Sequence, residues 1–154
     1  MPYFRWVLAV LALSTLAIAQ PKENSMTHHA RGTFTVKMLP LTPAPAEGIS
    51  RFSIDKEIHG DLEATTKGEM FSAGDPKSGV AGYVAIEVVT GTLAGKHGGF
   101  ALQHSGTMDQ GGRKLSVIVV PGSGTGELKG ISGTFDIQIA NGQHSYDLEY
   151  KLPE

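Results

Sequence analysis

A glycine-rich unit that occurs twice constrains the fold of this chain more than any other feature. The pattern G-x-L-x-G-x-x-G-x-F-x-[L/I] spans residues 91–102 and again 126–137, an offset of 35 positions (126 − 91). Its glycines allow the positive φ of a tight reversal, and its apolar residues alternate as they do in strands. The repeat therefore predicts two equivalent hairpins, with reversals at 95–98 and 130–133 between antiparallel strands.

The first 19 residues have the layout of a secretory signal peptide. Arg5 supplies the positive charge, residues 6–16 form an apolar run, and residues 17–19 read Ala-Ile-Ala, a small-residue cleavage site. The run is shorter than the ~20 residues that span a bilayer. We expect cleavage between Ala19 and Gln20, with an uncleaved anchor as the alternative. The mature protein is then secreted or periplasmic and has no membrane span.

Composition indicates one β-rich domain that depends on its core alone. We expect a disordered lead-in over 20–30 and a single domain over 31–154. All 20 glycines lie in this part, about twice the ordinary usage of ~7%, and the chain has no cysteine for disulfides. Without Arg5 the chain has 12 basic residues (13 − 1) against 15 acidic ones. The absence of a basic stripe argues against nucleic acid as a partner.

Alternating apolar residues predict about eight short strands and no long helix. Residues 83–93 are apolar on both faces, which indicates a strand covered on both sides. Lys56 interrupts the apolar face of 51–64, so we expect that face to be unevenly buried. Asn141-Gly142 is the strongest hairpin signal. We predict an all-β fold, an antiparallel barrel of about eight strands that closes to hide its edges, with a two-sheet sandwich as the alternative.

Several stretches carry a family resemblance. SGTGELKGISGTF after VVPG, then FALQHSGTM and the terminal HSYDLEY, resemble a bacterial family catalogued as domain of unknown function 3224. The resemblance covers residues 31–153. Members look like the small β-barrel of allene oxide cyclase, and the glycine hairpin is similar to one in plant dirigent proteins. The resemblance implies an allene oxide cyclase-like, eight-stranded barrel with an axial cavity, and it assigns no catalytic residue here.

Neither the glycine runs nor most of the histidines point to a known type of site. Residues 91–97 have one residue too few between glycines for a phosphate loop, and His97 stands where Ser or Thr is required. No histidine spacing sets a zinc site, and we expect neither metal nor cofactor. The histidines expected in solvent are His28, His29, His59 and His97.

Strand parity selects a set of candidate ligand-cavity residues. His104 shares a face with Phe100, and His144 shares one with two tyrosines. We place Glu87 inward with Tyr83, where burial would raise its pKa and suit it to acid–base work. The simpler interpretation is a satisfied core for each histidine, and solvent or a basic partner for Glu87. The candidates are Tyr83, Glu87, Phe100, His104, His144, Tyr146 and Tyr150.

Three functions fit this sequence. The leading hypothesis is a non-catalytic barrel that binds a small apolar or amphipathic ligand, with a homo-oligomer left open. The second is a cyclase, isomerase or lyase in which Glu87, His104 or a tyrosine moves a proton. The third is a structural envelope protein with a filled core. A cavity of ~300 Å³ would favour the first two.

Overall fold

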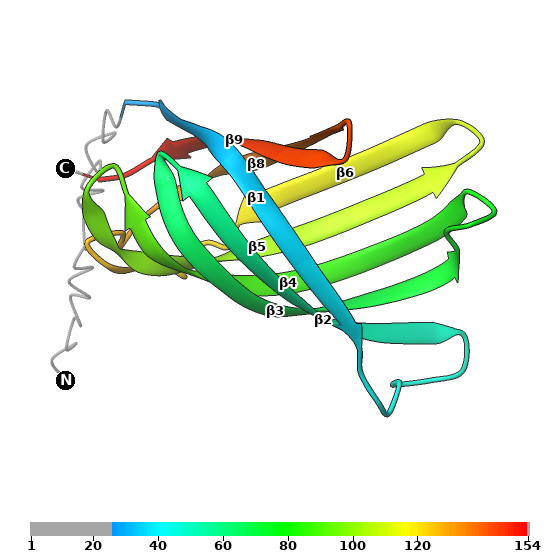
Figure 1. The fold of residues 1–154 in the computed structure, drawn as a ribbon. Coiled ribbons are helices and arrows are strands. Elements are labelled where there is room, and N and C mark those ends of the chain that lie inside the picture. The colour runs from blue at the N-terminus through cyan, green and yellow to red at the C-terminus, as the bar shows by residue number, and fades with distance from the viewer. Residues whose placement is uncertain (1–25, 154) are drawn as a thin grey trace, which may run out of the picture.

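The computed structural model describes residues 26–153, so the expected signal peptide and most of the expected lead-in lie outside it (Figure 1). These residues form nine strands joined by turns and loops. The strands are β1 (His28–Pro40), β2 (Ile49–Gly60), β3 (Leu62–Asp75), β4 (Val80–Leu93), β5 (Lys96–Asp109), β6 (Gly112–Val119), β7 (Thr125–Gly126), β8 (Ser132–Ala140) and β9 (Gln143–Lys151). No helix in this part of the chain is long and apolar enough to cross a membrane.

Eight of the strands close into an antiparallel barrel, as the sequence predicts. The hydrogen-bonded order is β4-β3-β2-β1-β9-β8-β6-β5, and β4 also pairs with β5, which closes the ring. The short β7 is extra and adds to β5 at Gly98 and Gly99. Every strand of the ring therefore has a neighbour on each side over at least part of its length, which leaves open edges only where a ladder stops short.

The barrel begins slightly earlier than expected. Strand β1 starts at His28 and pairs with β9 from the His28–Tyr150 position onward, whereas the sequence placed the start near Arg31. Ala30 is buried in the core. The residues around Ala30 are polar, so the sequence shows no apolar alternation there. The inward Ala30 side chain nevertheless belongs to β1, which starts three residues earlier than expected.

Only one of the two repeat copies forms a hairpin, and its reversal lies at residues 94–95 and not at the predicted 95–98. Leu93 pairs with Lys96 across a tight turn in which Ala94 and Gly95 have positive φ. The second copy does not form the predicted hairpin, because residues 127–130 form turns between β7 and β8, and β8 pairs with β9 and β6. Leu128 and Ile131 are buried there and belong to the hydrophobic core. The Asn141-Gly142 hairpin is confirmed, with both residues at positive φ.

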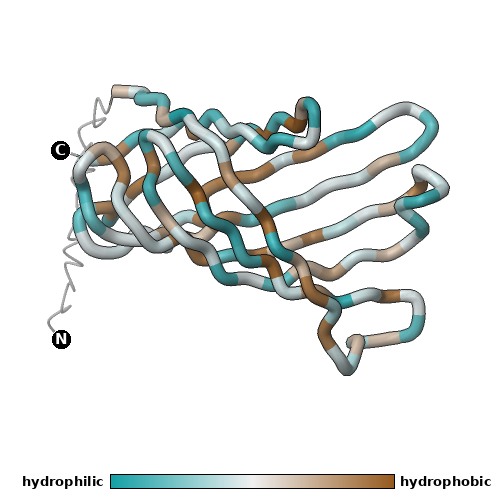
Figure 2. The backbone as a smooth tube through the Cα atoms, in the orientation of Figure 1, coloured by the Kyte–Doolittle hydropathy of each residue, from teal (hydrophilic) through white to brown (hydrophobic). Residues whose placement is uncertain are grey.

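One half of the barrel interior is filled, and we call it the closed half. Successive side chains of a strand point to opposite faces of the wall. Figure 2 shows hydrophobic and hydrophilic residues interspersed along the strands. Phe135 stacks on Tyr146 with ring centroids 5.0 Å apart, and Phe34 lies 6.4 Å from Phe135. Other fully buried members of this core are Ile58, Leu62, Val89, Leu93, Phe100, Leu102, Leu128 and Leu148.

The other half, which we call the open half, is not filled. Side chains of inward parity on the same strands become partly or fully exposed there, most of all Met38, Leu115 and Ile139. The β8–β9 hairpin turns at residues 141–142, and the ladder between β1 and β9 stops at Phe34 although β1 continues to Pro40. The ladder between β6 and β8 has one pair, Ile118 with Thr134. In Figure 1 these two strands diverge towards the β5–β6 turn.

Candidate functional site

Four polar side chains meet inside the barrel at the boundary between the two halves. Glu87 Oε1 accepts hydrogen bonds from Lys56 Nζ and from His104 Nε2, the latter at 2.8 Å. Thr66 Oγ1 donates to Glu87 Oε2 at 2.7 Å. All four residues are buried, and Glu87 has no exposed surface. We call these residues the polar cluster.

The strand register explains how side chains from four strands converge. Glu87 lies opposite Gly68 on β3, and Lys56 on β2 lies opposite Thr66. A Cβ on Gly68 would fall 2.5 Å from the Glu87 Cβ, so only glycine allows β3 to approach β4 this closely. Lys56 can therefore cross β3 to reach Glu87. Its Nζ also lies 5.3 Å from the centroid of the Phe34 ring, where the aromatic face stabilises a cation.

Glu87 is ionised, which corrects the expectation that burial would raise its pKa. Desolvation does act in that direction. The hydrogen bond from His104, the charge of Lys56 and the hydrogen bond from Lys56 outweigh it and lower the pKa to about 2. A carboxylate with both oxygens hydrogen-bonded and a cation beside it is poorly suited to accept a proton at neutral pH. Glu87 is therefore an electrostatic partner and not a free base.

Tyr83 lies above the polar cluster on the side of the open half. Its ring covers Gly106 on β5, where a Cβ would fall 2.3 Å from Tyr83 Cε1. Burial and then the charge of Glu87 raise the pKa of the Tyr83 phenol. The phenol is thus protonated at neutral pH. The ring occupies the space that a side chain at Gly106 would fill.

His104 presents one ring nitrogen for further bonding. In the neutral imidazole, an Nε2 that donates to Glu87 leaves the other nitrogen, Nδ1, as an acceptor. Nδ1 has no hydrogen-bond partner among the described residues. Every fully buried side-chain nitrogen or oxygen in these residues has a partner, so Nδ1 is not fully buried and retains access to solvent. The open half is the side on which the barrel interior is exposed.

The seam between β6 and β8 leads into the open half. A pocket of about 240 Å³ occupies it, lined on the inner side by Leu115, Val117, Phe135 and Ile137. Asp136 and Gln138 complete the lining, so the pocket is part apolar and part polar. Val117 pairs with His104 and Leu115 pairs with Gly106, which places the pocket at the level of the polar cluster and of Tyr83. The volume is smaller than the ~300 Å³ that ligand sites usually reach.

The structure brings three of the seven predicted cavity residues together and separates the other four. Tyr83, Glu87 and His104 meet at the floor of the open half. His144 lies at its rim, 5.0 Å from the Phe34 ring. The remaining three belong to the closed half. They are Phe100, in the core; Tyr146, whose hydroxyl accepts a hydrogen bond from the Leu62 N–H at 3.0 Å; and Tyr150, whose ring is tilted against that of His28 with centroids 5.4 Å apart.

Comparison with known proteins decides the family. The family described as "Protein of unknown function (DUF3224)" matches residues 30–150. The chain belongs to the DUF3224 family. A crystal structure of a DUF3224 protein of unknown function from Shewanella oneidensis MR-1, at 1.84 Å resolution, is similar to it with 43% identity and a TM-score of 0.75. The match covers 84% of this chain and 99% of the other. A comparison with curated proteins finds no match.

Two members of the polar cluster of this DUF3224 protein were missed from the sequence. Lys56 has the same parity as Ile54 and Ile58, which predicts an inward side chain, whereas its charge predicts a break in the buried face. Parity holds and the charge is misleading, because the inward carboxylate of Glu87 pairs with it. Thr66 has no comparable signal. Its role depends on the register between β3 and β4.

No metal centre is apparent in the part of this DUF3224 protein that the structure describes. Residues 26–153 contain no group of three or more His, Asp or Glu side chains placed to hold a metal ion. The His104 ring bonds to Glu87, and the Lys56 ammonium and the Thr66 hydroxyl bind that same carboxylate. The polar cluster can accordingly offer hydrogen bonds to a ligand, and it has no free carboxylate.

Proposed function

We propose that the protein binds a small amphipathic molecule in the open half of the barrel. The observation that carries the proposal is the exposure of inward-facing apolar side chains at this end, above a buried polar floor. Ile139 has inward parity and is 62% exposed, and Met38 and Leu115 are also exposed. Exposed apolar surface around a few convergent polar groups is the usual composition of a ligand site.

The size of the seam pocket limits the ligand. At about 30 Å³ per water-sized group, 240 Å³ holds roughly eight heavy atoms. A longer apolar chain would have to extend through the open end. The ligand is therefore short, on the scale of a medium-chain alcohol.

The polar floor favours an uncharged hydrogen-bond donor at the ligand's polar end. Lys56 and Glu87 neutralise each other, so they leave no spare cation for a carboxylate. His104 Nδ1 accepts a hydrogen bond, and the Tyr83 hydroxyl can donate one. A ligand hydroxyl satisfies both groups, whereas a carboxylate would have to lose its hydration without a cationic partner.

Calorimetry with 1-octanol tests this proposal, with octanoate as the charged comparison. We expect 1-octanol to bind the purified protein more tightly than octanoate does. Ile139→Ser should weaken 1-octanol binding roughly five- to tenfold, because it removes about 1 kcal/mol of apolar contact. The matched control is Ile86→Ser, since Ile86 is 51% exposed but faces outward on β4. Equal effects of the two substitutions, or no binding, would contradict the proposal.

A second candidate function is proton transfer by His104. The Glu87–His104 hydrogen bond has the arrangement in which a carboxylate orients an imidazole, leaving the other nitrogen basic. In that case a bound substrate would be converted and not merely held. Mass spectrometry of a ligand co-purified with the protein, before and after prolonged incubation, distinguishes the two. An unchanged ligand supports binding alone.

A further inference from the structure

The seam between β6 and β8 is where the backbone of the barrel wall loses its pairing. Its ladder has the single pair Ile118–Thr134, and the two strands diverge from there (Figure 1). Just beyond β6, the Val120 N–H donates to the Ala101 carbonyl of β5. Backbone groups of successive residues point to opposite edges of a strand, so the even-numbered residues of β6 bond to β5. The N–H and C=O of Leu115 therefore point into the seam, where the ladder gives them no partner.

Strand β8 presents a second open edge to the same seam. Ala140 and Gln143 close the two-residue turn as a hydrogen-bonded pair, so the even-numbered residues of β8 bond to β9. The backbone of Ile137 therefore faces the seam. Ile137 and Leu115 each lie three residues beyond the last seam pair, so they are level with each other. Two unpaired edges that border one gap are a template for a further strand.

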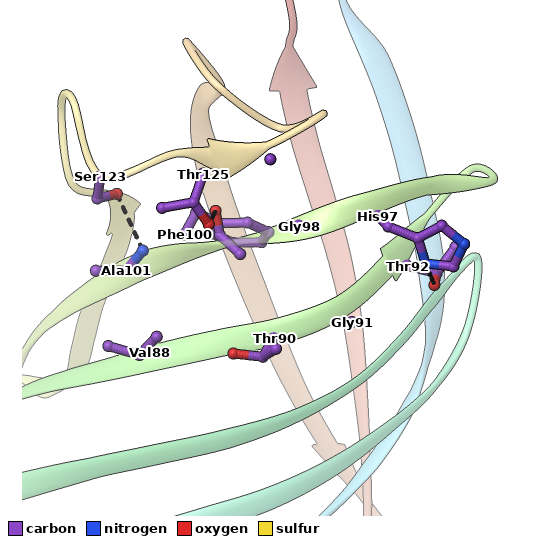
Figure 3. Close-up of a pocket in the computed structure, with 12 residues that line it drawn as sticks. Val88, Thr90, Gly91, Thr92, His97, Gly98, Phe100, Ala101, Ser123 and Thr125 are labelled. Atoms are coloured by element: carbon purple, nitrogen blue, oxygen red, sulfur yellow. Dashed lines mark hydrogen bonds between the residues drawn. The ribbon is translucent and has the colours of Figure 1, made fainter.

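Towards the closed half, the chain itself supplies partners where β6 ends. The Ala101 N–H of β5 donates to Ser123 Oγ at 3.0 Å (Figure 3). Strand β7 then pairs with Gly98 and Gly99 of β5, beside the groove of about 720 Å³ that Figure 3 shows. The closed half thus completes its wall with a side-chain oxygen and an added strand. The described part of the chain supplies neither to the seam in the open half.

The outer wall at β4 differs from the seam in this respect. The sequence predicted that β4 would be covered on both faces, whereas Val84, Ile86 and Val88 leave its outer face about half exposed. The backbone of β4 is nevertheless paired with β3 and with β5 along nearly its whole length. It has no open edge, so only the seam combines exposed apolar side chains with unpaired backbone on both rims.

Charged side chains on the outer side of the two rims lack partners as well. Asp147 of β9 is held by Arg31 and His29, whereas Asp136, directly opposite it on β8, makes no ion pair among the described residues. Carboxylates directly opposite each other on a sheet are destabilising. Lys114 on the β6 rim likewise makes no ion pair in this part of the chain. A cation beside Asp136 and an anion beside Lys114 would therefore complete both rims.

We propose that the seam binds an extended peptide segment of a partner protein, which adds to β6 as an antiparallel strand. The strand exchanges both backbone hydrogen bonds with Leu115, as in other cases of strand addition. Its inward side chains are apolar and enter the open half between Leu115 and Ile137. Its outward side chains are a lysine or arginine beside Asp136 and, two residues later, an acidic residue beside Lys114. The recognised pattern is apolar-basic-apolar-acidic-apolar.

The charge of the β6 rim argues against a second copy of this chain as the added strand. Arg113 and Lys114 are adjacent on the free part of β6. A twofold pairing of β6 with β6 would bring the basic residues of both copies onto one short edge. Lysines on an edge strand are a recognised means of preventing such pairing. A peptide that carries its own acidic residue avoids this repulsion.

Fluorescence anisotropy with a labelled, end-blocked peptide Val-Lys-Val-Glu-Val tests the backbone contact. N-methylation of the central valine should weaken binding at least about tenfold, because that N–H donates to the Leu115 carbonyl. The matched control is N-methylation of the glutamate, whose N–H points away from β6 and should cost less than about threefold. In the protein, Leu115→Pro removes only the seam-facing N–H and should cost about tenfold, whereas Leu115→Ala keeps that N–H and should cost less.

A second peptide, Val-Lys-Val-Lys-Val, tests the charge pattern. It should bind the wild-type protein about two- to fivefold more weakly than Val-Lys-Val-Glu-Val, because a lysine then lies beside Lys114. Lys114→Glu should reverse this preference. The exchange keeps the apolar residues of both peptides and the backbone of the protein, so it reads the charge contact alone.

Three results would overturn the proposal. They are no binding of Val-Lys-Val-Glu-Val at about 1 mM, equal effects of the two N-methyl groups, and an unchanged peptide preference in Lys114→Glu. A wild-type dimer in sedimentation velocity that Leu115→Pro abolishes would assign the edge to a second copy and would also overturn it. Circular dichroism checks that Leu115→Pro folds, and the N-methyl comparison needs no protein variant. The 1-octanol proposal is read at His104 and Ile139, so either proposal can fail alone.

Discussion

Lys56 and Glu87 lie on β2 and β4, two strands that do not pair with each other, and their side chains meet inside the barrel across β3. Gly68 makes this possible because it places no side chain in front of Glu87. The contact ties three strands together at mid-barrel. It also separates the filled core from the open half and sets the charge that a ligand would encounter at its floor.

Acid should destabilise the protein through Glu87. Its pKa is about 2 in the folded state against an ordinary value of 4.5, so the unfolded state binds the proton first as pH falls. The stabilisation is present above pH 4.5 and is lost between pH 4.5 and 2. The shift corresponds to ~3 kcal/mol. Urea denaturation at a series of pH values measures it. A Lys56→Met, Glu87→Gln double variant should show a shallower loss, although Glu69 and Asp147 still titrate in it.

Removing one charge of the pair should cost more than removing both. Lys56→Met leaves a buried, ionised Glu87, and Glu87→Gln leaves a buried ammonium, so each should lower the free energy of unfolding by about 3–5 kcal/mol. The double variant should recover most of that loss, because no buried charge remains. Denaturant titrations of the four proteins complete the cycle. Additive losses would mean that the two side chains do not interact.

The Tyr83–Gly106 contact should be sensitive to a single methyl group. Gly106→Ala places a Cβ within 2.3 Å of the Tyr83 ring and should cost about 1–3 kcal/mol of stability through overpacking. Tyr83→Ser removes the obstruction, so Gly106→Ala should cost little in that background. Thermal unfolding of the single and double variants gives the comparison. The same loss in both backgrounds would show that the ring does not lie over Gly106.

Two glycines with nearly equal backbone angles should respond differently to alanine. Gly95 and Gly130 have φ of 82° and 85°, so alanine at either position carries a similar backbone strain of about 1 kcal/mol. At Gly130 the added Cβ would also lie 2.7 Å from Pro153 Cγ, whereas at Gly95 nothing lies within 4 Å. Gly130→Ala should therefore be the more destabilising in a denaturant titration. A larger loss for Gly95→Ala would contradict this packing.

The sequence predicted features that depend on local chemistry better than those that depend on register. Asn141-Gly142 formed its hairpin because two adjacent residues suited to positive φ determine the turn. The second glycine repeat failed because β7 bonds to Gly98 and Gly99 of β5, a long-range pairing that no local pattern encodes. Parity placed Glu87 and His104 on inward faces. It did not show that Lys56, two strands away, would hold Glu87 ionised.

Nitrogen NMR of the His104 side chain during titration with 1-octanol tests the central claim, that the polar cluster is the floor of a ligand site, most directly. We predict that Nε2 carries the proton, held by Glu87, and that Nδ1 shifts as a ligand hydroxyl donates to it. His144, at the rim, should shift less, and Ile139→Ser should require more 1-octanol for the same change at His104. A His104 ring whose nitrogens do not move at saturating 1-octanol, while signals elsewhere do, would contradict the account.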